Sequence, residues 1–362
     1  MEKKSIVLVV DDTPENIDIL NELLKSDYQI KVALNGEKAV KIANSENQPD
    51  LILLDIMMPG MDGYEVCEKI KRNPKTETIP IIFLTALTEE SNEAKGLRLG
   101  AVDYITKPFS PELVKARVRN HLDLKKHRDN LEEMVRQRTI ELALTQEVTI
   151  ESMGTLAEYR DPETGGHIKR TQNYVKILAE HLKDHPRYSD FLNDESIHLL
   201  YISSPLHDIG KVGIADNILL KPGKLTDEEL EEMKKHAKFG KDSLASAKNK
   251  LGENSFLRVA REVAFTHHEK WDGSGYPQGL KEDDISIFGR LMAIADVYDA
   301  LISKRVYKLP LSHKKAVSII AEGKGSHFDP YMVDAFLEIQ DQFKSIALQF
   351  ADFEEERKAL LG

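Results

Sequence analysis

Residues 51–56, LILLDI, join an apolar run to one aspartate at its carboxyl end. Similar apolar runs occur at residues 5–10 (SIVLVV), 30–34 (IKVAL), 79–85 (IPIIFLT) and 104–106 (YIT). Segments with helical apolar spacing separate these runs. Strands that are apolar throughout are buried on both faces, as in a parallel sheet that helices cover on each side. These residues therefore predict a doubly wound α/β domain with a five-stranded parallel sheet.

Polar side chains follow the predicted strands at their carboxyl ends. They are Asp11, Asp12, Asp55, Thr85 and Lys107. Ligands of doubly wound sheets bind beyond the carboxyl ends of the strands, so we expect these side chains to form one site. Three carboxylates, a hydroxyl and a lysine suit phosphoryl transfer to an aspartate, because magnesium and the lysine offset the charge on the phosphoryl oxygens.

With Pro59, Gly63 and the Gly100–Ala101 turn also matching, residues 4–121 resemble the receiver domain of two-component response regulators. The resemblance implies that Asp55 accepts a phosphoryl group from a sensor histidine kinase. It implies a magnesium site made by Asp11, Asp12, Asp55 and the carbonyl of Met57. It further implies a switch formed by Thr85, Tyr104 and Lys107, and a cis Lys107–Pro108 bond.

Length and charge bound the remaining alternatives. The chain has 362 residues, more than the roughly 250–300 at which a single core stops growing, so two domains are expected. It has no run of about 18 apolar residues and no signal-peptide pattern, which predicts a cytoplasmic protein without a membrane partner. The single cysteine, Cys67, excludes an internal disulfide and a thiolate metal cage. A net charge of −11 disfavours nucleic acid as a partner.

Residues 117–152 contain no proline or glycine and are rich in Leu, Glu, Lys, Arg and Gln, which predicts one long helix. A seven-residue repeat runs along it through Leu124, Leu131, Arg138 and Thr145, with Met134 and Val148 at the companion position. Polar residues interrupt the apolar stripe. Two interpretations stay open: a weak parallel coiled coil that makes a homodimer, or a solvated spacer.

Histidines and acids gather beyond residue 150. They are Glu163, His167, His207, Asp208, His236, His267, His268 and Asp296, in contexts that include HDIGK, HHEKWDGSGYP and IADVYDA. Imidazole and carboxylate ligands favour iron, manganese, nickel or zinc and leave positions open for water. Asp208 directly follows His207, so one backbone position offers an imidazole to one metal and a carboxylate that can bridge to a second. This pattern predicts hydrolysis at a metal centre.

The stretch 150–345, which has helical patterns throughout, resembles an HD-GYP domain, a subgroup of HD phosphohydrolases associated with cyclic di-GMP. The matching strings include DPETGGHIKRT, SSPLHDIGKVGIADNILLKPGKLT, MKKHAKFG, AFTHHEKWDGSGYPQGL, IADVYDALIS and GSHFDP. The resemblance implies two or three divalent metals, held by His167, His207, Asp208, His236, His267, His268 and Asp296, with Glu163 as the ligand of a third. It also implies that Lys211 and Asp208 are catalytic, and that Lys211, Tyr276, Arg305 and Lys308 bind substrate.

One motif departs from this family. The chain reads SKRVY where the family often reads SDRPY, so Lys304 and Val306 differ while Arg305 and Tyr307 are retained. The departure leaves the metal ligands complete and concerns the substrate contacts alone.

These inferences predict four segments: a receiver domain at 1–121, a helical linker at 122–150, an all-α metal-dependent domain at 151–345 and a C-terminal tail at 346–362. The expected function is that of a response regulator that hydrolyses cyclic di-GMP to pGpG, with GMP as a further product left open. Two alternatives remain: hydrolysis of another cyclic dinucleotide or nucleotide, and a non-catalytic module that senses cyclic di-GMP or docks onto a partner such as a diguanylate cyclase.

Overall fold

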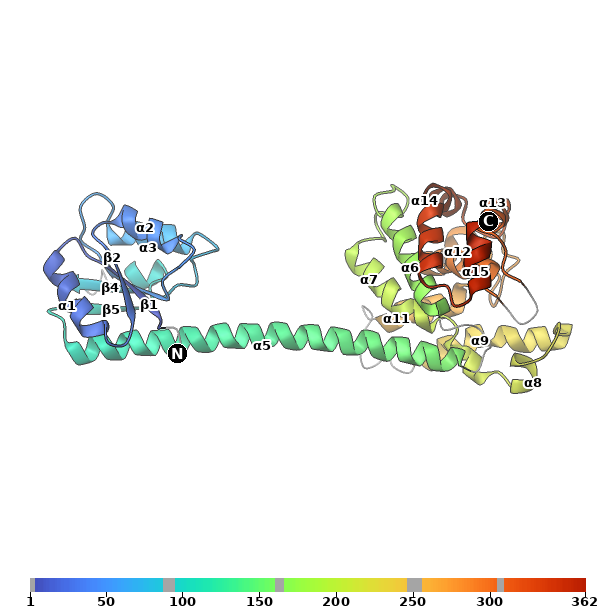
Figure 1. Cartoon of the computed structure of the whole chain (residues 1–362), viewed down its shortest axis with the longest axis horizontal. Coiled ribbons are helices and arrows are strands. Elements are labelled where there is room, and N and C mark those ends of the chain that lie inside the picture. Colours follow the sequence, from blue (N-terminus) through green and yellow to red (C-terminus); the bar gives the residue numbers. More distant parts are fainter. Residues whose placement is uncertain (1–3, 87–94, 160–165, 246–255, 305–308) are drawn as a thin grey trace. The chain divides into compact units, whose positions relative to one another are not determined.

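The structure is a computed structural model that describes residues 4–86, 95–159, 166–245, 256–304 and 309–362. The chain divides into two compact units, residues 1–140 and 141–362. Figure 1 labels helices and strands of both units where there is room. Among the described residues, no helix is long and apolar enough to cross a membrane.

The first unit contains a five-stranded parallel sheet. Its strands are β1 (Ile6–Val10), β2 (Gln29–Ala33), β3 (Leu51–Asp55), β4 (Ile81–Ala86) and β5 (Asp103–Lys107). The strand order is β2-β1-β3-β4-β5, and each neighbouring pair is parallel. Every residue of β1 and β3 is buried, as their apolar sequences require. The predicted doubly wound fold is confirmed.

Helices cover both faces of this sheet. The described ones are α1 (Pro14–Leu24), α2 (Gly36–Ala43), α3 (Gly63–Lys71) and the first turns of α5 (Pro111–Glu158). Leu20 of α1 and Val118 of α5 share one core with Val7 of β1. Ala39 of α2 and Val66 of α3 belong to a separate core on the other face. Successive residues of each strand thus point into different cores, one on each face of the sheet. This alternation is expected of a strand that is buried on both faces.

Helix α5 extends further at both ends than the predicted stretch 117–152. It begins at Pro111, since proline fits the first turn of a helix, where its missing N–H leaves no hydrogen bond unmade. It continues through Gly154, where a Cβ atom would lie 2.7 Å from the carbonyl oxygen of Pro205. The glycine therefore lets the helix approach the residue-205 turn closely, and this packing outweighs glycine's low helix propensity.

The second unit is helical. Its elements are α6 (Gly166–Leu182), α7 (Asp194–Ser203), the 3₁₀ helices η1 (Ser204–Leu206) and η2 (Ile209–Gly213), α8 (Asp216–Leu219), α9 (Asp227–Ala245), α11 (Phe256–Thr266), η3 (Glu282–Asp284), α12 (Ile287–Ile302), α13 (His313–Glu322), α14 (Pro330–Gln349) and α15 (Glu354–Leu361). No strand longer than an isolated bridge occurs among the described residues of this unit. The predicted all-α domain is confirmed. A capping box precedes α9, in which Thr226 and Glu229 each accept the other's backbone N–H.

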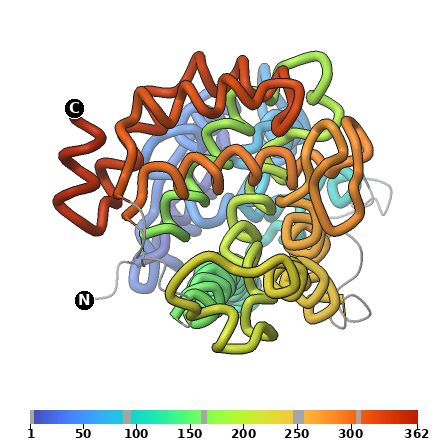
Figure 2. The backbone as a smooth tube through the Cα atoms, turned by 90° about the vertical axis from the view of Figure 1, so that its right-hand side faces the viewer, coloured from blue at the N-terminus to red at the C-terminus, as the bar shows by residue number. Residues whose placement is uncertain are grey.

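The core of the second unit lies among α6, α12 and α14. Tyr174 of α6 stacks on Phe343 of α14 with ring centroids 4.6 Å apart, and both meet Tyr298 of α12 edge-on. Helix α15 lies against α12, α13 and α14 (Figure 2), and its Leu360 is buried in the same core. Residues set apart as a tail in the sequence thus complete the bundle.

Candidate metal centre

The carboxyl edge of the sheet gathers the acids of the first unit. Oxygen atoms of Asp11, Asp12 and Asp55 all lie within 4.8 Å of one another. The Nζ atom of Lys107 is 2.8 Å from Asp11 Oδ2 and 3.0 Å from Asp55 Oδ1. Burial raises the pKa of Asp55, and the hydrogen bond from Lys107 only partly offsets it. The geometry brings together a carboxylate cluster that suits magnesium and a lysine next to the expected phospho-acceptor.

The other residues expected in this site lie close by. Met57, two positions after Asp55, is exposed. Thr85 and Tyr104 line one small cavity, and the Thr85 hydroxyl donates to the carbonyl oxygen of Ala86. The Lys107–Pro108 bond is cis, as the resemblance implies.

In the second unit, His207 and Asp208 lie in the short connection between η1 and η2. Two residues further on, Gly210 packs so tightly against α9 that a Cβ atom would lie 2.0 Å from the carbonyl oxygen of His236. This close approach of η2 to α9 carries Asp208 to the imidazole of His236.

One group of donors comprises Asp208, His236, His267 and His268, each offering an atom within 4.8 Å of the others. His236 comes from α9, and the adjacent pair His267–His268 follows the end of α11. Asp208 Oδ1 lies 3.3 Å from His236 Nε2 and 3.5 Å from His267 Nε2. We name this group subsite A.

A second group comprises His167 from α6, His207 and Asp296 from α12, again within 4.8 Å of one another. His167 Nε2 lies 3.3 Å from His207 Nε2 and 3.8 Å from Asp296 Oδ1. We name this group subsite B. The other oxygen of Asp208, Oδ2, is 3.4 Å from His207 Nε2, so one carboxylate faces both subsites.

Three of the imidazoles are held in orientation through Nδ1, the ring nitrogen that points away from the centre. The Nδ1 atoms of His207, His236 and His267 lie 2.9, 2.7 and 2.9 Å from the carbonyl oxygens of Ser204, Met233 and Val263. A carbonyl only accepts, so each Nδ1 carries the proton and each neutral ring points a bare Nε2 lone pair into the centre.

The donor set fits a metal. Among the described residues, Asp208 Oδ1, His236 Nε2 and His267 Nε2 are buried and have no hydrogen-bond partner of good geometry. Buried polar atoms without partners cost roughly 1–3 kcal/mol each. Lone pairs that converge at such short distances are stabilised by a cation, and mixed imidazole and carboxylate ligation suits a divalent transition metal.

Electrostatics favours the same protonation states. Burial lowers the pKa of His207 to about 4 and lowers those of His236 and His268. Burial alone would raise the pKa of Asp208, but Lys211 and His207 hold it well below its usual value. His267 differs: burial opposes its charged form, yet the neighbouring Asp208 carboxylate raises its pKa.

Two predicted substrate residues, Lys211 and Tyr276, contact ligands of the centre. Lys211 Nζ lies 2.8 Å from Asp208 Oδ2. The Tyr276 ring stacks on His268 with centroids 4.7 Å apart, and both line a pocket of about 320 Å³ that also reaches Asp296. The pocket thus opens directly onto ligands of both subsites, at a volume within the usual range for a ligand site.

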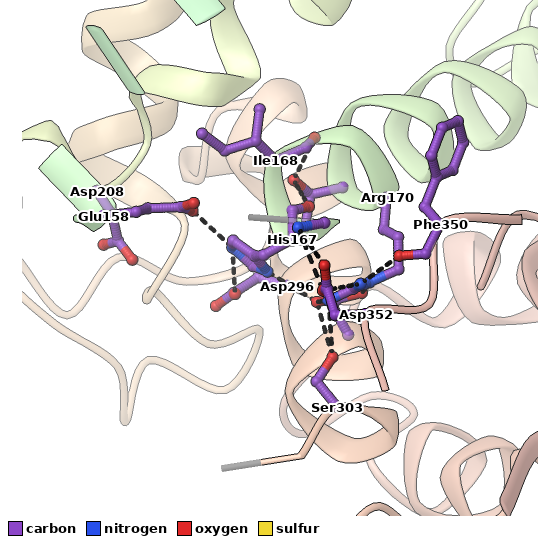
Figure 3. A network of polar contacts seen from close by, with 12 residues as sticks. Glu158, His167, Ile168, Arg170, Asp208, Asp296, Ser303, Phe350 and Asp352 are labelled. Atoms are coloured by element: carbon purple, nitrogen blue, oxygen red, sulfur yellow. Dashed lines mark hydrogen bonds and ion pairs between the residues drawn. The ribbon is translucent and has the colours of Figure 1, made fainter. Parts of the chain in front are cut away.

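Three expected residues, Glu163, Arg305 and Lys308, lie outside the described residues. Conversely, the structure places three acids at the centre that the sequence did not single out for it. Glu158 at the end of α5 has Oε1 3.7 Å from His167 Nε2 (Figure 3), and no pattern in the sequence marked it.

The other two acids, Asp299 and Glu269, hold the metal-ligand residues or the loop next to them in place. Asp299 accepts from His167 Nδ1 at 2.8 Å, and its position three residues after Asp296 on α12 put it on the same helical face. Glu269 is buried in the loop after His268, where it accepts from the backbone N–H groups of Gln278 and Leu280 at 2.7 and 3.0 Å. Its position directly after the histidine pair was the available signal.

Comparison with known proteins gives the same two parts. The response regulator receiver domain matches residues 7–119, and the HD domain matches residues 151–332. A Vibrio cholerae serotype O1 protein named "Probable cyclic di-GMP phosphodiesterase" is 51% identical over 356 residues, which cover 96% of this chain and 80% of the relative. This chain belongs to the HD-domain response regulators.

Two further relatives bear on the chemistry of this HD-domain response regulator. The cyclic di-GMP phosphodiesterase response regulator RpfG of Xanthomonas campestris pv. campestris is 34% identical over 358 residues, covering 95% of this chain and 90% of the relative. A 3'3'-cGAMP-specific phosphodiesterase of Vibrio cholerae is 41% identical over 213 residues, covering 59% of this chain and 38% of that protein. The HD domain is a metal-dependent hydrolase type, so the chain is an enzyme of that class.

Proposed function

We propose that this response regulator hydrolyses cyclic di-GMP at a centre of two or three divalent metals, giving pGpG. The observation that carries the proposal is the Asp208 carboxylate, whose two oxygens face subsite A and subsite B. Bound metals at such a centre supply an activated water and offset charge on the phosphoryl oxygens. The names of the relatives support the substrate.

The residues of the chain have distinct roles in this proposal. The seven residues of the two subsites hold the metals, and Glu163 is the ligand of a third. Lys211, within ion-pair distance of Asp208, is placed to bind a phosphoryl oxygen or to protonate the leaving oxygen. Tyr276 shapes the pocket against His268, and Arg305 and Lys308 contact the substrate.

A second candidate keeps the metal chemistry and changes the substrate to another cyclic dinucleotide. The relative named as specific for 3'3'-cGAMP favours considering it. A non-catalytic sensing module is less well supported, because a centre that had lost turnover would not need all seven donors together with Lys211.

The receiver has a regulatory role in the proposal. Asp55 accepts a phosphoryl group from a sensor histidine kinase while Asp11, Asp12 and the carbonyl of Met57 hold magnesium with it. Thr85, Tyr104 and Lys107 then respond to the new charge. The exposed apolar residues Leu131, Met134 and Val148 of α5 support a homodimer along this helix.

The test is anaerobic purification with metal analysis, followed by turnover of cyclic di-GMP and 3'3'-cGAMP under the same conditions. We expect at least two metals per chain and faster turnover of cyclic di-GMP. Faster turnover of 3'3'-cGAMP would select the second candidate, and no turnover by the metal-loaded protein would contradict both. In the Arg305→Ala variant, KM for cyclic di-GMP should rise far more than KM for an aryl phosphodiester.

A further inference from the structure

The segment from Phe350 to Glu356, named here the C-terminal clamp, runs from the end of α14 into the first turn of α15. It lies beyond the part of the chain that matches the HD domain. It holds no metal donor of either subsite. Its polar groups nevertheless contact residues next to His167 and at the end of α12, which carries Asp296.

The connection begins at His167. Its Nδ1 is 2.8 Å from Asp299 Oδ2, and Asp299 in turn accepts from Arg170 Nε at 2.6 Å and from the NH2 group of Arg170 at 3.0 Å. Asp299 and Arg170 are each only 1% exposed. A carboxylate held on both oxygens by a planar guanidinium has little freedom to rotate, so the Asp299 carboxylate fixes the plane of the His167 ring.

The clamp holds the outer side of the same guanidinium. The NH1 group of Arg170 donates to the carbonyl oxygen of Phe350 at 2.8 Å and to Asp352 Oδ2 at 2.9 Å, while its NH2 group donates to Ser303 Oγ at 2.9 Å (Figure 3). Every nitrogen of Arg170 therefore has a partner. A buried guanidinium needs all of these bonds to offset the cost of losing water.

The clamp also fixes the backbone on two sides of this network. Both carboxylate oxygens of Asp352 lie 3.2 Å from the N–H of Gly166, the residue directly before His167. A Cβ atom at Gly166 would lie 2.4 Å from the NH1 nitrogen of Arg170 and 2.5 Å from the Phe350 oxygen, so only glycine fits there.

On the other side, the buried carboxylate of Glu356 accepts from the N–H of Lys304 at 2.8 Å and from the N–H of Asp352 at 3.0 Å. Lys304 directly follows Ser303, the other partner of Arg170. The amide of Gly166, directly before His167, and the amide of Lys304, two residues after the end of α12, are therefore both bonded to one seven-residue segment.

We propose that the C-terminal clamp positions His167 for metal binding, with Asp352 and Glu356 as positioning residues that act through Arg170 and Asp299. The inference rests on the proposed function only for its catalytic consequence. Removing groups that orient a metal ligand typically lowers metal affinity or activity by roughly 10- to 100-fold.

The test uses full-length, metal-stripped Asp352→Asn protein titrated with Co²⁺ by absorption spectroscopy, with thermal unfolding of the metal-free form measured in parallel. The amide keeps the shape of the side chain and loses the charge that pairs with Arg170. We expect the Co²⁺ affinity of one subsite to fall about tenfold and the d–d bands to change, with unfolding little altered, since the Asp352 side chain is 27% exposed.

Glu355→Gln is the matched control, because Glu355 lies in the same turn but pairs only with the exposed Nζ of Lys304 among the described residues. It should leave Co²⁺ binding unchanged. In Mn²⁺-dependent turnover of cyclic di-GMP, Asp352→Asn should need about tenfold more metal and recover at saturation.

Unchanged Co²⁺ affinity and spectrum in Asp352→Asn would overturn the proposal. Loss of metal-free stability without rescue by metal would also overturn it, because the clamp would then only hold the bundle together. If wild type binds Co²⁺ and the variant binds it more weakly, yet neither hydrolyses cyclic di-GMP, the clamp stands and the proposed function falls.

Discussion

The Nε2 atoms of His167 and His207 face each other at 3.3 Å in the interior of the second unit, while each ring is held through Nδ1 by an oxygen, from Asp299 and from Ser204. Imidazoles that are neutral and donate through Nδ1 would point their Nε2 lone pairs at one another in this arrangement. Only a shared proton or a cation makes such a contact favourable, and the nearby Asp296 supplies a carboxylate for the cation. The pair therefore supports subsite B as a candidate metal site.

Asp208→Ala should remove bound metal and turnover together, because both subsites lose the carboxylate that faces them. Elemental analysis of metal content and hydrolysis of cyclic di-GMP check this. An unfolding transition of residues 1–140 that matches wild type would show that the receiver still folds. Asp341→Ala, at an exposed position of α14, is the control. Wild-type turnover in Asp208→Ala would rule out the proposed mechanism.

Metal affinity should fall as the pH is lowered from 8 toward 5.5. Burial opposes the charged form of His267, but the neighbouring Asp208 carboxylate raises its pKa above the usual value of about 6.5, so protons compete with the metal for its Nε2 below that pKa. Below that pKa, affinity should drop about tenfold per pH unit for each proton displaced. His207, with its pKa lowered to about 4, stays neutral throughout and adds nothing in this window.

Calorimetric titration of Mn²⁺ in buffers of different ionisation enthalpy measures the released proton directly. We expect proton release at pH 6, which lies below the raised pKa of His267, and less release as the pH rises. Affinity independent of pH across this window would show that no ligand carries a proton in the metal-free protein.

Glu269→Gln should loosen the loop that places Tyr276 on His268. The carboxylate accepts two backbone N–H groups, whereas an amide can accept only through its oxygen and turns an N–H₂ toward the second donor. The free energy of unfolding of the second unit should fall by roughly 1–3 kcal/mol, and KM for cyclic di-GMP should rise. Glu282→Gln is the exposed control in η3, and equal behaviour of the two variants would contradict the role of Glu269.

Gly154→Ala should displace α5 from the turn before His207. Alanine would gain about 1 kcal/mol in helix propensity, but its Cβ would meet the Pro205 oxygen at 2.7 Å, and such overpacking costs about 1–3 kcal/mol. We expect net destabilisation in urea and reduced turnover, since Pro205 and Leu206 directly precede the ligand pair. Ser152→Ala, exposed on the same helix, should do neither, and full activity in Gly154→Ala would argue against this contact as a route to the metal centre.

Phosphorylation of Asp55 should change phosphodiesterase activity through α5. This helix begins in the first unit and ends in the second, where Gly154 contacts Pro205 close to His207 and Asp208. A phosphoryl group adds about −1.5 to −2 charges beside Lys107. Coupling of roughly 1–3 kcal/mol would change activity about 5- to 150-fold. We expect beryllofluoride to alter phosphodiesterase activity or dimerisation of wild type, with activation as the direction, and to leave Asp55→Ala unaffected. Identical activity and oligomeric state with and without beryllofluoride would leave the two units uncoupled.

The sequence by itself determined the parts of this protein that depend on local pattern. The apolar run at 51–56 required a strand buried on both faces, and the parallel order followed because helix-like segments separate the runs. The pairing of His207 with Asp208 fixed one element of the metal centre, since neighbours in sequence cannot be far apart in space.

The tertiary structure decided which distant groups orient the ligands. Asp299 reaches His167 across 132 residues and Arg170 reaches Asp352 across 182, contacts that no periodicity encodes because they depend on how α6, α12 and the C-terminal clamp pack. Glycines show the same limit. Gly154 and Gly166 both lie in helices despite the low helix propensity of glycine, and only the tertiary structure shows that Pro205 and the Arg170 network take the space of a Cβ atom there.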